Sequence, residues 1–62
     1  MDHTELELLL DKYGCCGIAE ALAAICHEKA EHVRASYSDE ALASVWTRNA
    51  NVFDRASGKL SA

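Results

Sequence analysis

The side chains best suited to chemistry lie between positions 27 and 32, where the sequence reads His-Glu-Lys-Ala-Glu-His. On a helix, residues four apart share a face, so His27 lies beside Glu31, and Glu28 beside His32. The HExxH motif of zinc metalloproteases needs a second histidine at position 31, where this chain has glutamate. We therefore interpret the segment as a solvated, salt-bridged helix face and expect no metal ion and no cofactor. A zinc site made from these residues and the cysteines is the alternative.

The three cysteines, Cys15, Cys16 and Cys26, give little support for thiol chemistry or disulfide bonds. No pair has CxxC spacing, and an odd number with two adjacent members makes a poor disulfide framework. Cys16 lies near a predicted helix start, a position that favours thiol reactivity, whereas Cys15 and Cys26 fit as small core residues. Nothing in the sequence orders a cysteine beside a histidine. We therefore expect a reducing, cytoplasmic environment and no enzyme.

One predicted helix face carries residue types that can read nucleic acids. Thr47, Arg48, Asn51 and Arg55 share it, and such side chains contact base edges and phosphates. No Lys/Arg cluster supports the helix, and the acidic chain opposes the phosphate interactions that dominate this kind of affinity. A small helix-turn-helix-like nucleic-acid-binding module therefore stays an alternative, and nucleic acid is not the expected partner.

The formal net charge is −4, and the acids are concentrated in the first half of the chain. Residues 1–31 hold seven acids and two bases, a balance of −5, and residues 32–62 hold three acids and four bases, a balance of +1. This asymmetry favours contacts between unlike ends of two molecules. The acidic start differs from the basic start of a signal peptide, and no run of about 18 apolar residues exists to span a membrane. We expect a cytoplasmic protein with no membrane partner.

The residues described above must be positioned by helices, and the central helix is the most clearly marked. The stretch from Ile18 to Tyr37 has no proline and no glycine, and its apolar residues recur at helical spacing. We predict a helix over about residues 17–36, whose apolar face is covered by the segments before and after it. That face holds Ile18, Leu22, Ile25, Cys26 and Val33.

A short helix is predicted before the central one, over about residues 5–13. Thr4 and Glu7 form a capping box at its start, and Gly14 supplies a left-handed residue at its end. The sequence Gly-Cys-Cys-Gly at positions 14–17 then forms the turn into the central helix.

A third helix is predicted over about residues 39–57. Ser38 is expected to be its N-cap and Gly58 its C-cap. The apolar face of this helix holds Leu42, Val45, Trp46, Val52, Phe53 and Ala56.

The short connection between the two long helices predicts an antiparallel hairpin within a single all-α domain over residues 1–62. A chain of 62 residues buries only about 60% of its unfolded surface, so assembly with a partner is the expected remedy. Two hairpins would form a four-helix bundle, and a monomeric three-helix bundle is the alternative. We prefer the homodimer because the apolar stripes look wider than one hairpin can bury. The predicted interface comprises Leu22, Ile25, Lys29, Val33, Leu42, Trp46, Asn49 and Phe53.

Lys29 and Asn49 are polar residues at the centres of these apolar faces. Buried polar residues cost stability unless they are paired, and their best-known use is to set register and oligomeric state. In the alternative interpretation, Lys29 extends its ammonium group to the rim while its stem packs. Asn49 is too short to do the same.

One further pattern runs through most of the chain and comprises Tyr13, Gly14, Gly17, Glu20 to Ala23, Ile25, Cys26, Glu28 to His32, Asp39, Glu40, Leu42, Ala43 and Trp46. In this pattern the chain resembles short hypothetical proteins of bacteria and of their phages and plasmids. This resemblance implies an origin on a mobile element and carries no activity with it. We expect a small, non-catalytic protein that acts through protein–protein contact with itself or with a larger partner; an inhibitor of a host complex is a further alternative.

Overall fold

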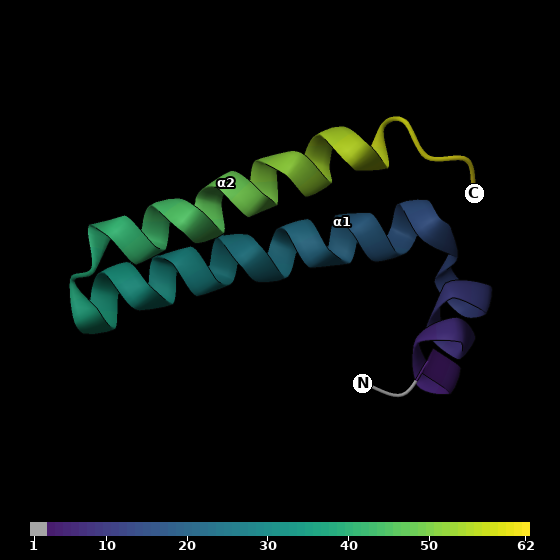
Figure 1. Ribbon diagram of the computed structural model, residues 1–62, viewed down its shortest axis with the longest axis horizontal. Coiled ribbons are helices and arrows are strands. Elements are labelled where there is room, and N and C mark those ends of the chain that lie inside the picture. The colour runs from purple at the N-terminus through teal and green to yellow at the C-terminus, as the bar shows by residue number, and fades with distance from the viewer. Residues whose placement is uncertain (1–2) are drawn as a thin grey trace.

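The computed structural model describes residues 3–62 and consists of two helices packed side by side (Figure 1). Helix α1 comprises His3–Tyr37 and helix α2 comprises Glu40–Ser57, which returns antiparallel along α1. No strand occurs among the described residues. The all-helical hairpin predicted from the sequence is therefore confirmed, whereas the prediction of three separate helices is wrong.

The two helices expected over residues 5–13 and 17–36 form one element that is kinked at Gly14. Gly14 has φ 77° and ψ 165°, a backbone conformation that is essentially restricted to glycine. The expected positive φ is present, but ψ is extended rather than left-handed helical. Gly14 is the single non-helical residue where a four-residue turn over positions 14–17 was predicted, because the helix resumes directly after it. We call residues 3–13 the arm and residues 15–37 the long segment of α1.

The C-terminal tail packs against the kink. The backbone N–H of Cys16 donates to the Ala62 carbonyl at 2.9 Å, and the Cys16 thiol donates to the Ser57 carbonyl at 3.1 Å. The first bond satisfies an amide that a helix start would otherwise leave unpaired. A Cβ on Gly14 would lie 2.8 Å from the Ala62 carbonyl oxygen, so glycine is required both for its φ and for this close approach.

The helix ends differ from the predicted caps. Asp39, rather than Ser38, is the N-cap of α2, and its carboxylate accepts from the backbone N–H of Leu42 at 2.9 Å. Ser38 instead makes the turn, with φ 52°. Gly58 ends α2 in the right-handed region, at φ −72°, rather than as a left-handed cap. Thr4 lies inside α1, which begins at His3.

The interface between the helices is made of small side chains. Buried residues follow each other in steps of four and three along α1, the spacing of a heptad seam. Alanine at these positions lets two helix backbones approach closely, and the larger Trp46 and Phe53 of α2 are only half-buried. The buried residues are Ala19, Ala23, Cys26, Ala30 and Val33 in α1, and Ala43 and Ala50 in α2.

This packing corrects the predicted core. The sequence predicts the large residues Ile18, Leu22 and Ile25 under the neighbouring helix, but α2 packs on the small residues one position further along. Leu22 and Ile25 keep 39% and 47% of their surface exposed. The physical reason is that a stripe of small residues runs beside the stripe of large ones, and only the small stripe allows close helix approach.

Candidate functional site

Several large apolar side chains that the hairpin leaves exposed or half-buried lie on one of its faces. Ile18, Leu22, Ile25 and Lys29 each stand one residue before a buried position of α1. One residue corresponds to about 100° around a helix. In α2, Leu42 and Asn49 likewise come one residue before the buried Ala43 and Ala50.

Because the helices run antiparallel, one step back along each chain turns toward the same side of the hairpin. The half-buried Trp46 and Phe53 come four residues after Leu42 and Asn49 and so share their side of α2. We call this surface the apolar face. It consists of Ile18, Leu22, Ile25 and Lys29 from α1, and Leu42, Trp46, Asn49 and Phe53 from α2.

The predicted interface residues coincide with the apolar face except at one position. Val33 is buried between the two helices at 6% exposure and is unavailable to a partner. Lys29 and Asn49 are both exposed, so neither is a buried polar residue in the single chain. The antiparallel register, in which Arg34 pairs with Glu40 and His27 with Asp54, places Asn49 at about the level of Lys29.

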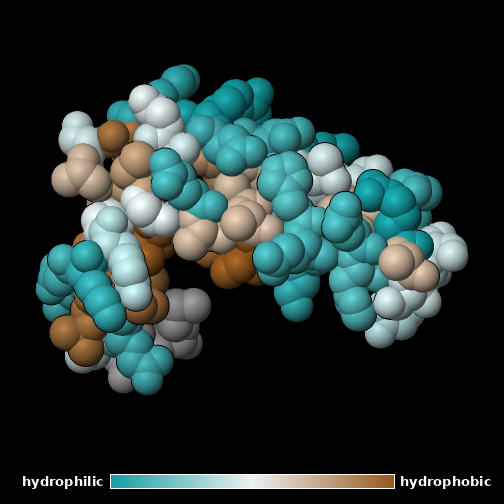
Figure 2. Space-filling view, turned by 180° about the vertical axis from the view of Figure 1, so that it is seen from behind, coloured by the Kyte–Doolittle hydropathy of each residue, from teal (hydrophilic) through white to brown (hydrophobic). Residues whose placement is uncertain are grey.

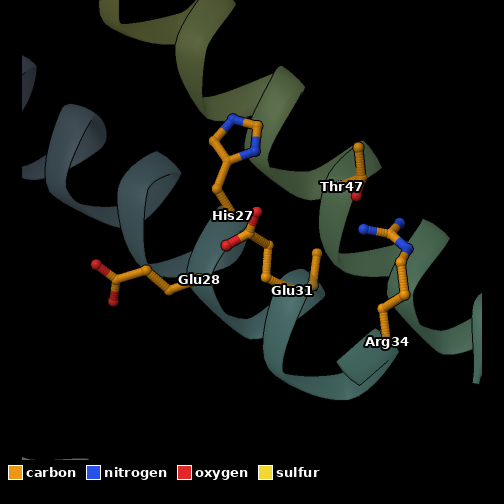
Figure 3. Close-up of a pocket in the computed structure, with 6 residues that line it drawn as sticks. His27, Glu28, Glu31, Arg34 and Thr47 are labelled. Atoms are coloured by element: carbon orange, nitrogen blue, oxygen red, sulfur yellow. The ribbon is translucent and has the colours of Figure 1, made fainter. Parts of the chain in front are cut away.

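The opposite side of the hairpin is polar. His27 lies 3.4 Å from the Asp54 carboxylate, and Arg34 donates to Glu40 at 2.9 Å. A shallow hollow of about 410 Å³ lies between the helices on this side, and Figure 3 shows Arg34 and Thr47 beside it and Glu28 directed away. All four paired side chains are substantially exposed, and such surface pairs contribute only about 0–1 kcal/mol.

The candidate metal and thiol residues are distributed over different parts of the fold. Cys26 is buried between the helices, Cys15 is exposed at the kink, and Cys16 is half-buried against the tail. His27 pairs with Asp54, whereas the His32 ring contacts the Tyr37 ring edge-on at 5.9 Å between centroids. Within residues 3–62, no three His, Cys, Asp or Glu side chains are grouped closely enough to hold a metal ion.

The candidate nucleic-acid residues lie on α2 outside the apolar face. Arg48, Asn51 and Arg55 are exposed, and Thr47 is half-buried beside the polar hollow. Asp54, which stands among them, carries an opposing charge. Neither Arg48 nor Arg55 forms an ion pair within the described part of the chain.

A second apolar surface lies where the arm meets the long segment of α1. This surface, which we call the elbow groove, is a hollow of about 350 Å³, and Figure 2 shows apolar side chains gathered around it. Ile18, Leu22 and Ile25 belong both to the groove and to the apolar face, so the two surfaces are continuous. The groove is lined by Leu6, Leu9, Tyr13, Gly17, Ile18, Ala21, Leu22 and Ile25.

Neither the elbow groove nor the outer edge of α2 was predicted from the sequence. Leu9 and Tyr13 belong to the segment that was expected to cover the central helix, yet they remain 45% and 55% exposed. Val45 and Val52 were placed on the buried face of the last helix and are 46% and 48% exposed. The heptad spacing of small residues was the available signal, because it marks the side on which two helices can approach.

No protein-family model, no curated protein and no solved structure matches the chain. No helix among the described residues has the length and apolar character needed to cross a lipid bilayer.

Proposed function

We propose that the protein is a non-catalytic association module that forms a homodimer through its apolar face. Two hairpins would stack face to face into a four-helix bundle, and the large side chains of each copy would form the core that a single copy lacks. No large side chain is fully buried among residues 3–62 of the single chain. The apolar face would thus supply the burial that the alanine seam cannot.

The accessible surface is the observation that carries the proposal. The chain exposes 4704 Å² for a mass of 6.8 kDa. A compact folded monomer of this mass would expose roughly 3,950 Å². The excess of roughly 750 Å² is close to the ~800 Å² that each partner buries in a standard protein interface.

The composition of the face supports a second copy as the occupant. Its only charged residue is Lys29, and its only other strongly polar residue is Asn49 at about the same level. A single polar layer across an apolar helix interface is a known means of selecting register and number of helices. A catalytic role lacks a comparable argument, because the cysteines and histidines are spread over different parts of the fold and Lys29 is the single charged residue of the apolar face.

The test compares two neighbouring substitutions by sedimentation equilibrium at micromolar concentration under reducing conditions. Ile25→Glu places a charge on the apolar face and is expected to weaken the dimer by at least about tenfold, since it removes a side chain worth ~1.5–3 kcal/mol when buried. Ala24→Glu adds the same charge at an exposed position on the polar side and is expected to leave the dimer intact.

A wild-type protein that stays monomeric throughout the concentration range would contradict the proposal. Equal weakening by Ile25→Glu and Ala24→Glu would also contradict it, because the effect would then come from net charge and not from the face.

A further inference from the structure

We infer that the elbow groove receives α2 of the second copy, so that the two hairpins associate with their turns at the same end of the dimer. This inference rests on the proposed homodimer and specifies its arrangement. It assigns a role to two features that face-to-face stacking alone does not use: the groove on the arm side of α1, and the exposed valines on the outer edge of α2.

The two possible arrangements of the dimer differ in which helix of one copy meets which helix of the other. When two hairpins stack with their turns at the same end, a two-fold axis along the bundle places α1 of one copy over α2 of the other. With the turns at opposite ends, α1 would lie over α1. The groove flanks the α1 side of the apolar face, so in the first arrangement it faces the outer edge of the partner's α2.

The elbow groove and the exposed Val52 lie at about the same height along the hairpin. The groove extends along α1 from Gly17 to Ile25. The register set by the contact of Cys16 with Ser57 and the pair of His27 with Asp54 places Val52 at about the level of Ile25. With the turns at the same end of the dimer, equivalent residues of the two copies lie at the same height. The exposed Val52 side chain of one copy then lies at the elbow groove of the other.

The charges of the arm and of the outer edge of α2 are opposite in sign. The arm carries Glu5, Glu7 and Asp11 against a single base, Lys12. Val52 is flanked on its helix by Arg48 and Arg55, four residues before it and three after it. Both arginines are exposed and unpaired within the described part of the chain. An acidic arm thus meets a basic edge in this arrangement.

The arrangement with the turns at opposite ends is less favourable because of the polarity and charge of the surface that would enter the groove. It would bring the outer side of the partner's α1 to the elbow groove. On that side of α1, Glu28, Lys29 and His32 surround Ile25. An apolar groove beside an acidic arm would then receive a mixed and partly acidic surface. Polar groups entering an apolar hollow unpaired cost free energy, so the edge of α2 is the better fit.

The first experiment measures the distance between the two turns. A spin label is attached at Ser38→Cys in a background in which Cys15, Cys16 and Cys26 are replaced, after circular dichroism and sedimentation have confirmed the fold and the dimer. Pulsed electron resonance is expected to give a label separation far below the 37 Å long dimension of the molecule. A separation comparable to that dimension would overturn the inference.

The second experiment tests the contact itself. Val52→Lys is expected to raise the dimer dissociation constant about tenfold or more, because it puts an ammonium group into the groove. The adjacent Asn51→Lys makes the same change on the polar side and is expected to shift the constant by less than twofold. Leu9→Glu in the same chain as Val52→Lys is expected to restore most of the affinity, since each copy then offers a carboxylate to its partner's lysine.

The outcomes separate the inference from the proposed function. A wild-type protein that is monomeric would contradict both the proposed homodimer and the inferred arrangement. A dimer that Ile25→Glu dissociates but Val52→Lys leaves unchanged would overturn the inference alone, as would equal effects of Val52→Lys and Asn51→Lys. If Val52→Lys fails to fold, the label separation at position 38 decides the arrangement.

Discussion

Gly14 determines how the arm leaves the hairpin. Its φ of 77° with ψ of 165° interrupts the helix for one residue, and the arm therefore turns away from the long segment of α1 (Figure 1). The tail closes over the same point, with the Ala62 carbonyl bonded to the Cys16 amide. The direction of the arm, and with it the elbow groove, depends on this one residue.

Gly14→Ala is expected to destabilise the protein by about 1–3 kcal/mol, because alanine cannot adopt this backbone conformation without strain and its Cβ would collide with the Ala62 carbonyl. Gly17→Ala is the matched control. Gly17 is helical, and a Cβ there would lie 3.4 Å from the Tyr13 Cβ, which is ordinary contact. That substitution should be neutral or stabilise by up to ~1 kcal/mol. Urea unfolding of both variants measures the difference, and equal effects would contradict the role given to Gly14.

At the scale of the elements, the pairing of α1 with α2 depends on small side chains. Ala43 and Ala50 are completely buried at 0% exposure, and the alanines of α1 lie opposite them. Each alanine contributes little apolar area, but together they allow close approach and dense van der Waals contact. The large residues are displaced to the neighbouring face as a consequence.

Ala50→Leu is expected to destabilise the hairpin by about 1–3 kcal/mol, because three added carbon atoms have no space between the helices. Ala41→Leu introduces the same side chain at an exposed position of the same helix and should change the free energy of unfolding by no more than about 0.5 kcal/mol. Thermal and urea unfolding followed by circular dichroism provide the comparison. Stabilisation by Ala50→Leu would show that the helices are not packed through their alanines.

At the scale of the whole molecule, the chain is a thin body of 37 × 25 × 13 Å with one apolar side and one polar side. A single layer of helices cannot enclose a core of large side chains, since every residue of the layer lies near a surface. Two layers can, and the proposed dimer supplies the second. In that assembly Lys29 of one copy would face Asn49 of the other. The two polar side chains would then be hydrogen-bonding partners across the dimer interface.

Asn49→Leu is expected to raise the stability of the dimer by about 1–2 kcal/mol and to broaden the distribution of oligomeric states, because an apolar residue packs equally well in several arrangements. Asn51→Leu on the polar side serves as the control and should have neither effect. Sedimentation equilibrium combined with urea unfolding measures both quantities. An unchanged oligomeric state with unchanged stability would contradict the role assigned to Asn49.

Much of the local structure follows from the sequence by itself. The apolar period and the absence of proline determined two long helices, and the polar pair Ser38 and Asp39 determined the turn, although the N-cap is the second of them. The positive φ of Gly14 follows from the glycine preference for such conformations. Seven of the eight residues of the predicted interface lie on one side of the hairpin, and the eighth, Val33, is buried between the helices.

Only the tertiary structure decided which side of each helix is buried. Two stripes of residues with helical spacing run side by side along α1. One consists of Ile18, Leu22 and Lys29, and the other consists of the alanines that directly follow them, Ala19, Ala23 and Ala30. Periodicity cannot choose between stripes about 100° apart, and hydrophobicity favours the wrong one. The choice depends on how closely two backbones can approach, which is a property of the helix pair and not of either helix. The elbow groove likewise required the backbone angle at Gly14, and the C-terminal residue Ala62 lies against this kink from the far end of the chain.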